Sequence, residues 1–170
     1  MPNWCFNTVT LSNDDPKVIE AFAEALKSTD CEPFQHLRPM PEEHKDDWYS
    51  WHVSNWGTKW DASISDWEQQ DDNTIWLVFD TAWSPPIELY NYLTEQGWNV
   101  DAQYQEEGMG FIGSYVDGDD NYYEYDLSDR ASIEELPQDL IDFGDLLTRH
   151  EEWMEDNDDM EEDEDEEEQK

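Results

Sequence analysis

The sequence predicts an α+β fold, in which an antiparallel sheet carries two helices on one face. The clearest strand is residues 74–83, where β-branched and aromatic residues follow one another between turn signals. The clearest helix begins near Asp15-Pro16, where an acidic N-cap and a proline precede apolar residues at helical spacing. The chain also has 10 Trp, 8 Tyr and 6 Phe, so it holds enough apolar surface for a folded core.

Six segments have the composition of strands. Both faces of the third, residues 74–83, are apolar, as in a central strand that is covered on both sides. A second helix is expected after Ser84-Pro85-Pro86, with Gly97 as its C-cap. One or two further helices are expected between residues 128 and 156. The predicted strands are residues 4–11, 61–68, 74–83, 100–104, 110–116 and 122–127.

An insertion at about residues 31–61 separates the first helix from the second strand. Three prolines limit regular structure in its first part, so residues 31–49 are expected to be irregular, with an extended loop over residues 34–41. The second part, residues 48–61, reads WYSWHVSNWGTKWD. So dense a group of tryptophans indicates a core around which strands pack, with a stacking or partner-binding surface as the alternative.

The order of these elements is that of a ferredoxin-like (split βαβ) sheet with one further strand. We therefore expect a ferredoxin-like domain over residues 1–127, which includes the Trp-rich insertion. An acidic helical region would follow over residues 128–156. Residues 157–170 are almost purely acidic and are expected to be a disordered tail.

The charge of the chain restricts its partners. The sequence has 46 Asp+Glu against 8 Lys+Arg, which gives a formal net charge of −38. Carboxylates repel phosphates, so we expect no direct binding of nucleic acid and no binding to an anionic membrane. Base stacking on the aromatic residues of the sheet would also need a basic groove, which this composition does not supply. A basic protein is the expected partner.

Targeting and redox signals favour the cytoplasm of the cell that makes or receives the protein. No apolar run approaches the roughly 20 residues of a membrane span, and the N-terminus lacks the basic and apolar regions of a signal peptide. Cys5 and Cys31 form no CxxC pair, so they are expected to be free thiols in a reducing compartment.

No motif predicts catalysis, a metal site or a cofactor, and we therefore expect a protein that is not an enzyme. The histidines form no HExxH or HxH pattern and have no cysteine neighbours at zinc spacing. Asp117, Asp119 and Asn121 stand at the first three positions of a calcium loop, but Tyr122 and Ser128 replace its glycine and its glutamate. The histidines are His36, His44, His52 and His150.

Four segments together resemble the YubB-type ferredoxin-like domain proteins of conjugative plasmids, phages and prophages. They are MPNWCFN (1–7), NWGTKWD (55–61), TAWSPP (81–86) and GMGFIG (108–113). The resemblance covers roughly residues 1–125. It implies a ferredoxin-like fold without an iron–sulfur cluster and a mobile-element gene of the kind often found near genes that counter host defences. It supplies no catalytic residue.

The first functional hypothesis is an acidic, non-enzymatic DNA mimic that inhibits a basic, nucleic-acid-binding or defence protein of the host. Averaged over the surface of residues 1–150, the net charge per unit area is about one third of that of duplex DNA. Mimicry therefore requires the acids to gather on one face. The C-terminal region is where we expect them to gather. The predicted partner-binding acids are Asp126, Asp129, Glu134, Glu135, Asp139, Asp142, Asp145, Glu151, Glu152, Glu155 and Asp156.

The alternative is a protein-interaction module that binds through the insertion, because Trp and Tyr are common anchors at interfaces. Aromatic residues left over from the core could also support a homodimer. A third hypothesis is a cryptic enzyme without a visible substrate. The residues of the alternative surface are Trp48, Tyr49, Trp51, Trp56, Lys59 and Trp60.

Overall fold

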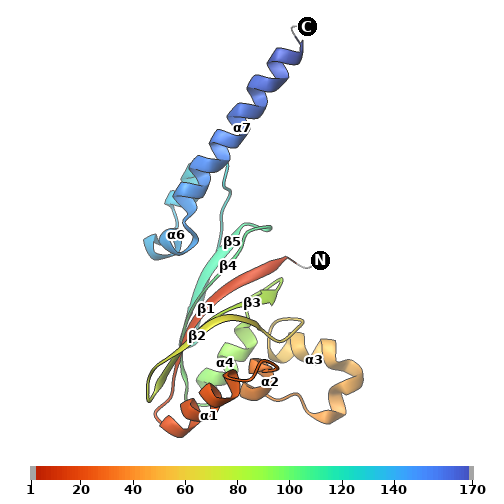
Figure 1. Ribbon diagram of the computed structural model, residues 1–170, viewed down its shortest axis with the longest axis vertical. Coiled ribbons are helices and arrows are strands. Elements are labelled where there is room, and N and C mark those ends of the chain that lie inside the picture. Colours follow the sequence, from red (N-terminus) through yellow and green to blue (C-terminus); the bar gives the residue numbers. More distant parts are fainter. Residues whose placement is uncertain (1–2, 169–170) are drawn as a thin grey trace.

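The computed structural model describes residues 3–168, with side chains from residue 3 to residue 157. Its centre is one antiparallel sheet in the order β2-β3-β1-β4-β5-β6 (Figure 1). The α+β class predicted from the sequence is confirmed. The strands are β1 (Trp4–Ser12), β2 (Ser63–Asp71), β3 (Thr74–Ala82), β4 (Asn99–Glu106), β5 (Phe111–Val116) and β6 (Asp119–Glu124).

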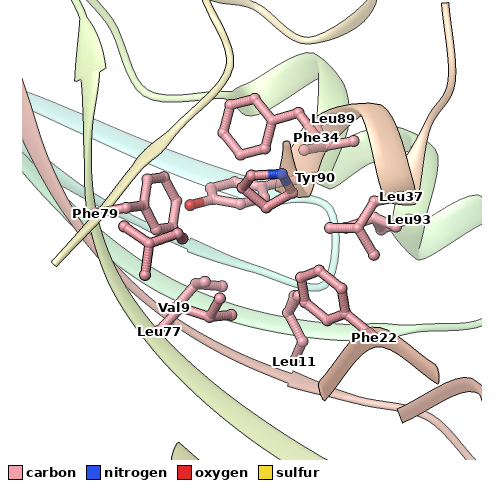
Figure 2. A pocket seen from close by; sticks show the side chains of 12 residues that line it. Val9, Leu11, Phe22, Phe34, Leu37, Leu77, Phe79, Leu89, Tyr90 and Leu93 are labelled. Atoms are coloured by element: carbon pink, nitrogen blue, oxygen red, sulfur yellow. The ribbon is translucent and has the colours of Figure 1, made fainter. Parts of the chain in front are cut away.

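One face of the sheet packs against α1 (Pro16–Leu26) and α4 (Ile87–Glu95) and forms the main core. Figure 2 shows Val9 and Leu77 of the strands facing Phe22 of α1, with Leu93 of α4 beside them. The void between these elements is only about 10 Å³, at the lower limit for one water molecule. The interior is therefore closely packed.

The two covering helices begin where the sequence predicts, and α4 also ends at its predicted C-cap. The Asp15 carboxylate accepts the Lys17 backbone N–H at 3.0 Å, and Pro16 occupies the first helical turn of α1. Helix α4 follows Pro86 and ends before Gly97, whose φ of 88° is the left-handed conformation that glycine adopts without strain.

The insertion is largely helical, so the predictions of irregular structure over residues 31–49 and of an extended loop over residues 34–41 were wrong. It forms α2 (Pro33–Leu37), the 3₁₀ helix η1 (Glu42–Asp47) and α3 (Trp48–Asn55). Helix α2 forms because Pro33 opens it and the distant Asp61 carboxylate accepts the N–H groups of Phe34 and Gln35, both at 2.9 Å. Phe34 then packs in the main core.

The C-terminal helices α5 (Arg130–Glu134), α6 (Gln138–Gly144) and α7 (Leu146–Glu168) pack on the opposite face of the sheet. Their core includes Ile112, which points away from the main core. Helix α7 then extends far beyond the sheet (Figure 1). It continues through residues 157–168, where we predicted disorder, because that stretch lacks glycine and proline and is rich in the good helix former Glu. The boundary near residue 127 stays a prediction.

Strand β3 is covered on one face only, which corrects the prediction of a strand buried on both. Ile75 and Leu77 are buried in the main core, whereas Trp76, Val78 and Asp80 on the other face are half-exposed. The reason is that α6, which covers part of that face, packs mainly on β4 and β5. No helix within residues 3–168 has the length and apolar composition that crossing a membrane requires.

Candidate interaction surface

Three sequence segments that carry the family resemblance are joined by buried hydrogen bonds at one end of the sheet. The Asn7 side-chain amide donates to Thr81 Oγ1 at 2.9 Å, and the Thr81 hydroxyl donates to the Ser84 carbonyl at 2.7 Å. The Ser84 hydroxyl donates to the Gly57 carbonyl at 2.7 Å. Asn7 and Thr81 are fully buried. Because a buried polar group is costly when left unpaired, this chain of bonds fixes β1, β3 and the insertion relative to one another.

The fourth segment, the β4–β5 hairpin, meets the same end of the sheet. The buried Glu106 carboxylate accepts the backbone N–H groups of Gly108 and Met109 at 2.7 and 2.8 Å. A Cβ on Gly108 would lie only 2.6 Å from the Asn3 amide nitrogen, and the Asn3 carbonyl accepts the Trp83 N–H at 2.9 Å. The turn of this hairpin is therefore held against the N-terminal segment.

This end of the sheet displays a set of large aromatic side chains, which we call the aromatic surface: Trp4, Tyr49, Trp60 and Trp83, with Lys59 among them. Their exposed fractions are 49, 48, 38 and 47%. The Lys59 ammonium lies 4.5 Å from the ring centre of Trp60, 5.1 Å from that of Trp83 and 5.9 Å from that of Tyr49. The Trp4 and Trp60 rings are 6.3 Å apart. The aromatic surface is thus one contiguous patch around a cation.

Trp83 has a backbone conformation that a tryptophan rarely adopts. Its φ is 69°, in the left-handed region, which costs a residue with a Cβ roughly 1–2 kcal/mol. Its ring is about half exposed, so burial offsets little of that cost. Glycine would fit this position with less strain. The presence of Trp83 therefore suggests that its side chain serves a purpose on the surface.

The Trp-rich insertion is divided between core and surface. Trp56 is 2% exposed, stacks on His52 at 4.0 Å and donates its indole N–H to the Arg38 carbonyl. Trp51 is half-buried and packs edge-on against Trp56. Trp48, Tyr49, Lys59 and Trp60 reach the surface, as the alternative hypothesis requires. Trp4 and Trp83, which were not predicted to belong to that surface, occur in two of the segments that carry the resemblance.

A hollow of about 590 Å³ lies within the insertion and is lined by residues that include Trp48, His52, Trp60 and Asp61. Burial raises the pKa of Asp61 to about 6, although three backbone N–H groups donate to its oxygens. His52 Nδ1 lies 2.9 Å from the Lys59 carbonyl. Both polar groups are thus engaged in holding the insertion together.

The predicted C-terminal acids are distributed over the turn before α5 and the helices α5, α6 and α7. Asp126 and Asp129 accept the N–H groups of Ser128 and Ala131, so they organise the turn before α5 and cap that helix. Glu134 and Glu151 both contact the Arg130 guanidinium, at 2.7 and 3.8 Å. Asp139 lies 3.5 Å from Gln103, Asp142 accepts from Gln138, and Asp145 is the C-cap of α6. Glu135, Glu152, Glu155 and Asp156 are exposed.

Among the side chains that the structure describes, no group of three or more His, Cys, Asp or Glu residues is placed to hold a metal ion.

No family model matches the chain, and no curated protein matches it. Among solved structures, it is similar to a protein api92 from Yersinia pseudotuberculosis, which is described under the family name DUF1281. The two share 20% sequence identity over 58% of this chain and 41% of that chain, with a TM-score of 0.43. The matched part spans less than half of the api92 chain, and a likeness at this level says nothing of function.

Proposed function

We propose that this protein is a non-enzymatic interaction module that binds a basic partner protein through the aromatic surface. The observation that carries the proposal is the contiguous exposure of Trp4, Tyr49, Trp60 and Trp83 around Lys59. Exposed aromatic patches of this kind are typical of protein-binding sites, where Trp and Tyr are the usual anchors. Buried hydrogen bonds hold the backbone beneath these side chains in place, so binding requires little further ordering of the chain.

The proposed fold beneath this surface is ferredoxin-like. The order β2-β3-β1-β4 supports it, with α1 connecting β1 to the insertion and α4 connecting β3 to β4. Strands β5 and β6 and the C-terminal helices would be additions. Membership of the YubB-type family of mobile-element proteins is likewise a proposal. It rests on the four resembling segments, all of which contribute to the end of the sheet that carries the aromatic surface.

The net charge of −38 favours a basic partner, such as a nucleic-acid-binding or defence protein of a mobile element's host. A partner of this kind would meet aromatic anchors within an acidic field. The field would speed association and make it sensitive to salt, whereas the anchors would set the lifetime of the complex.

A second candidate, the DNA mimic, is favoured by the charge density of α7. Residues 151–168 lie on this helix, and fourteen of these eighteen residues are Asp or Glu. At about 1.5 Å rise per residue, that is one carboxylate per about 1.9 Å of helix axis. Duplex DNA carries one charge per roughly 1.7 Å of axis. The mimic would therefore be the part of α7 beyond the sheet rather than the whole predicted set of acids.

Affinity capture from a host-cell lysate, with quantitative mass spectrometry, tests the two candidates together. The bait variants are W60A/W83A for the aromatic surface and E151Q/E152Q/E155Q/D156N for α7. W153A is the matched control, because Trp153 has the same 38% exposure as Trp60 but lies on α7. The interaction module predicts that only W60A/W83A loses the partner. Loss with the α7 variant alone would refute it in favour of the DNA mimic.

A further inference from the structure

A cleft of about 420 Å³ adjoins the aromatic surface and is built from residues far apart in the sequence. Trp83 forms one of its walls. Phe111 of β5 and Tyr122 of β6 also line it, and their rings lie 5.3 Å apart. Tyr122 is 52% exposed, so the cleft is open to solvent. Two carboxylates, Glu88 of α4 and Asp120 of β6, complete the lining.

A hydrogen bond from Tyr104 fixes the position of Asp120, and the absence of a side chain at Gly113 allows that bond. The Tyr104 hydroxyl crosses from β4 and donates to Asp120 Oδ1 at 2.7 Å. It can do so because Gly113 lies between the two strands: a Cβ there would be only 2.3 Å from the Tyr104 oxygen. Burial and the neighbouring Asp120 carboxylate raise the pKa of Tyr104, so the tyrosine remains a donor. The cleft therefore presents an oriented carboxylate beside aromatic rings.

We infer that this cleft receives an arginine side chain of the basic partner, an inference that rests on the proposed function. A guanidinium stacks flat on aromatic rings and keeps its N–H groups free for carboxylates, whereas an ammonium is compact and strongly hydrated. The chain itself already uses this contact, since the Arg38 guanidinium lies 4.4 Å from the ring centre of Tyr92. The surrounding charge is also complementary to the proposed occupant.

Titration of the full chain with short blocked peptides, followed by NMR of the tryptophan indole N–H signals, tests the inference. The peptides are Gly-Gly-Xaa-Gly-Gly with arginine, lysine or citrulline, where citrulline keeps the shape of arginine but lacks its charge. W83F assigns the Trp83 signal. We expect the arginine peptide to shift that signal and to bind more tightly than the other two.

Two acid variants and one matched control locate the site. D120N and E88Q each remove one charge-assisted contact and should weaken the arginine peptide about tenfold. D119N should bind as the wild type does, because Asp119 neighbours Asp120 but lies on the opposite face of β6. Using both D120N and E88Q guards against an indirect effect through Tyr104.

Equal binding of the arginine and citrulline peptides, or of the arginine and lysine peptides, would overturn the inference. Unchanged binding by both acid variants would do the same. If arginine peptides fail to bind while partner capture still depends on Trp60 and Trp83, the cleft assignment is wrong and the proposed interaction module stands.

Discussion

Two substitutions of Trp83, W83A and W83G, test whether its left-handed backbone is strained, as the functional argument requires. Both W83A and W83G remove the exposed ring and its contact with Lys59, so both lose the same side-chain interactions. They differ only in the Cβ, which alanine keeps in the left-handed conformation at φ 69°. Their difference in stability therefore isolates the backbone.

The expected difference follows from two opposing contributions. Removing the Cβ relieves roughly 1–2 kcal/mol of left-handed strain. The extra freedom of glycine in the unfolded chain costs about 0.5–1 kcal/mol. W83G should therefore be more stable than W83A by about 0.5–1 kcal/mol. The control is A21G on the exposed side of α1, where the same change from alanine to glycine should cost about 1 kcal/mol.

Urea unfolding, followed by circular dichroism, measures these free energies. Partner binding should fall equally in W83A and W83G, because the ring rather than the backbone makes the contact. If W83G is less stable than W83A by as much as A21G costs in α1, then the left-handed backbone stores no strain and the functional argument from Trp83 fails.

Four further predictions concern buried polar groups. The Tyr90 hydroxyl is buried with no hydrogen-bond partner among the described residues, so Y90F should stabilise the protein by about 1 kcal/mol in urea unfolding. Y115F, which breaks two bonds to α4, should destabilise it by about 1–2 kcal/mol. Burial raises the pKa of Cys5 to about 12, so a thiol reagent should label the half-buried Cys31 in the folded protein and Cys5 only after unfolding. Burial raises the pKa of Asp61 from 3.8 to about 6, so the folded state binds this proton more tightly than the unfolded state. Stability relative to D61N should therefore fall, by on the order of 2 kcal/mol, as pH rises from about 4 through 6, and a difference independent of pH would contradict this.

Local sequence patterns predicted most of the strands and the two helices of the main core. Asp15-Pro16 marked the start of α1, and the apolar spacing that follows it predicted the buried face of that helix. The β-branched and aromatic run of β3 predicted the strand but not its exposed face, because coverage depends on where α6 packs. Helix α2 was missed for a similar reason. The carboxylate that caps it belongs to Asp61, 27 residues further along the chain.

The candidate sites required contacts that no local pattern reveals. A left-handed φ is usually predicted from a glycine, so the sequence gives no sign of it at Trp83. The cleft joins Glu88, Phe111 and Asp120 from three separate elements, and Gly113 is needed to bring Tyr104 to Asp120. The resembling segments and the density of tryptophans in the insertion were the signals that pointed to this end of the sheet. The count of acids predicts a basic partner but does not predict which surface would bind it.

The most direct test of the interaction module is the dissociation constant of the captured partner for the wild type, W60A/W83G and W153A, measured at matched salt. The aromatic surface predicts a loss of about tenfold or more for W60A/W83G and no change for W153A. Equal affinity of all three proteins would show that the partner binds elsewhere, and would contradict the account.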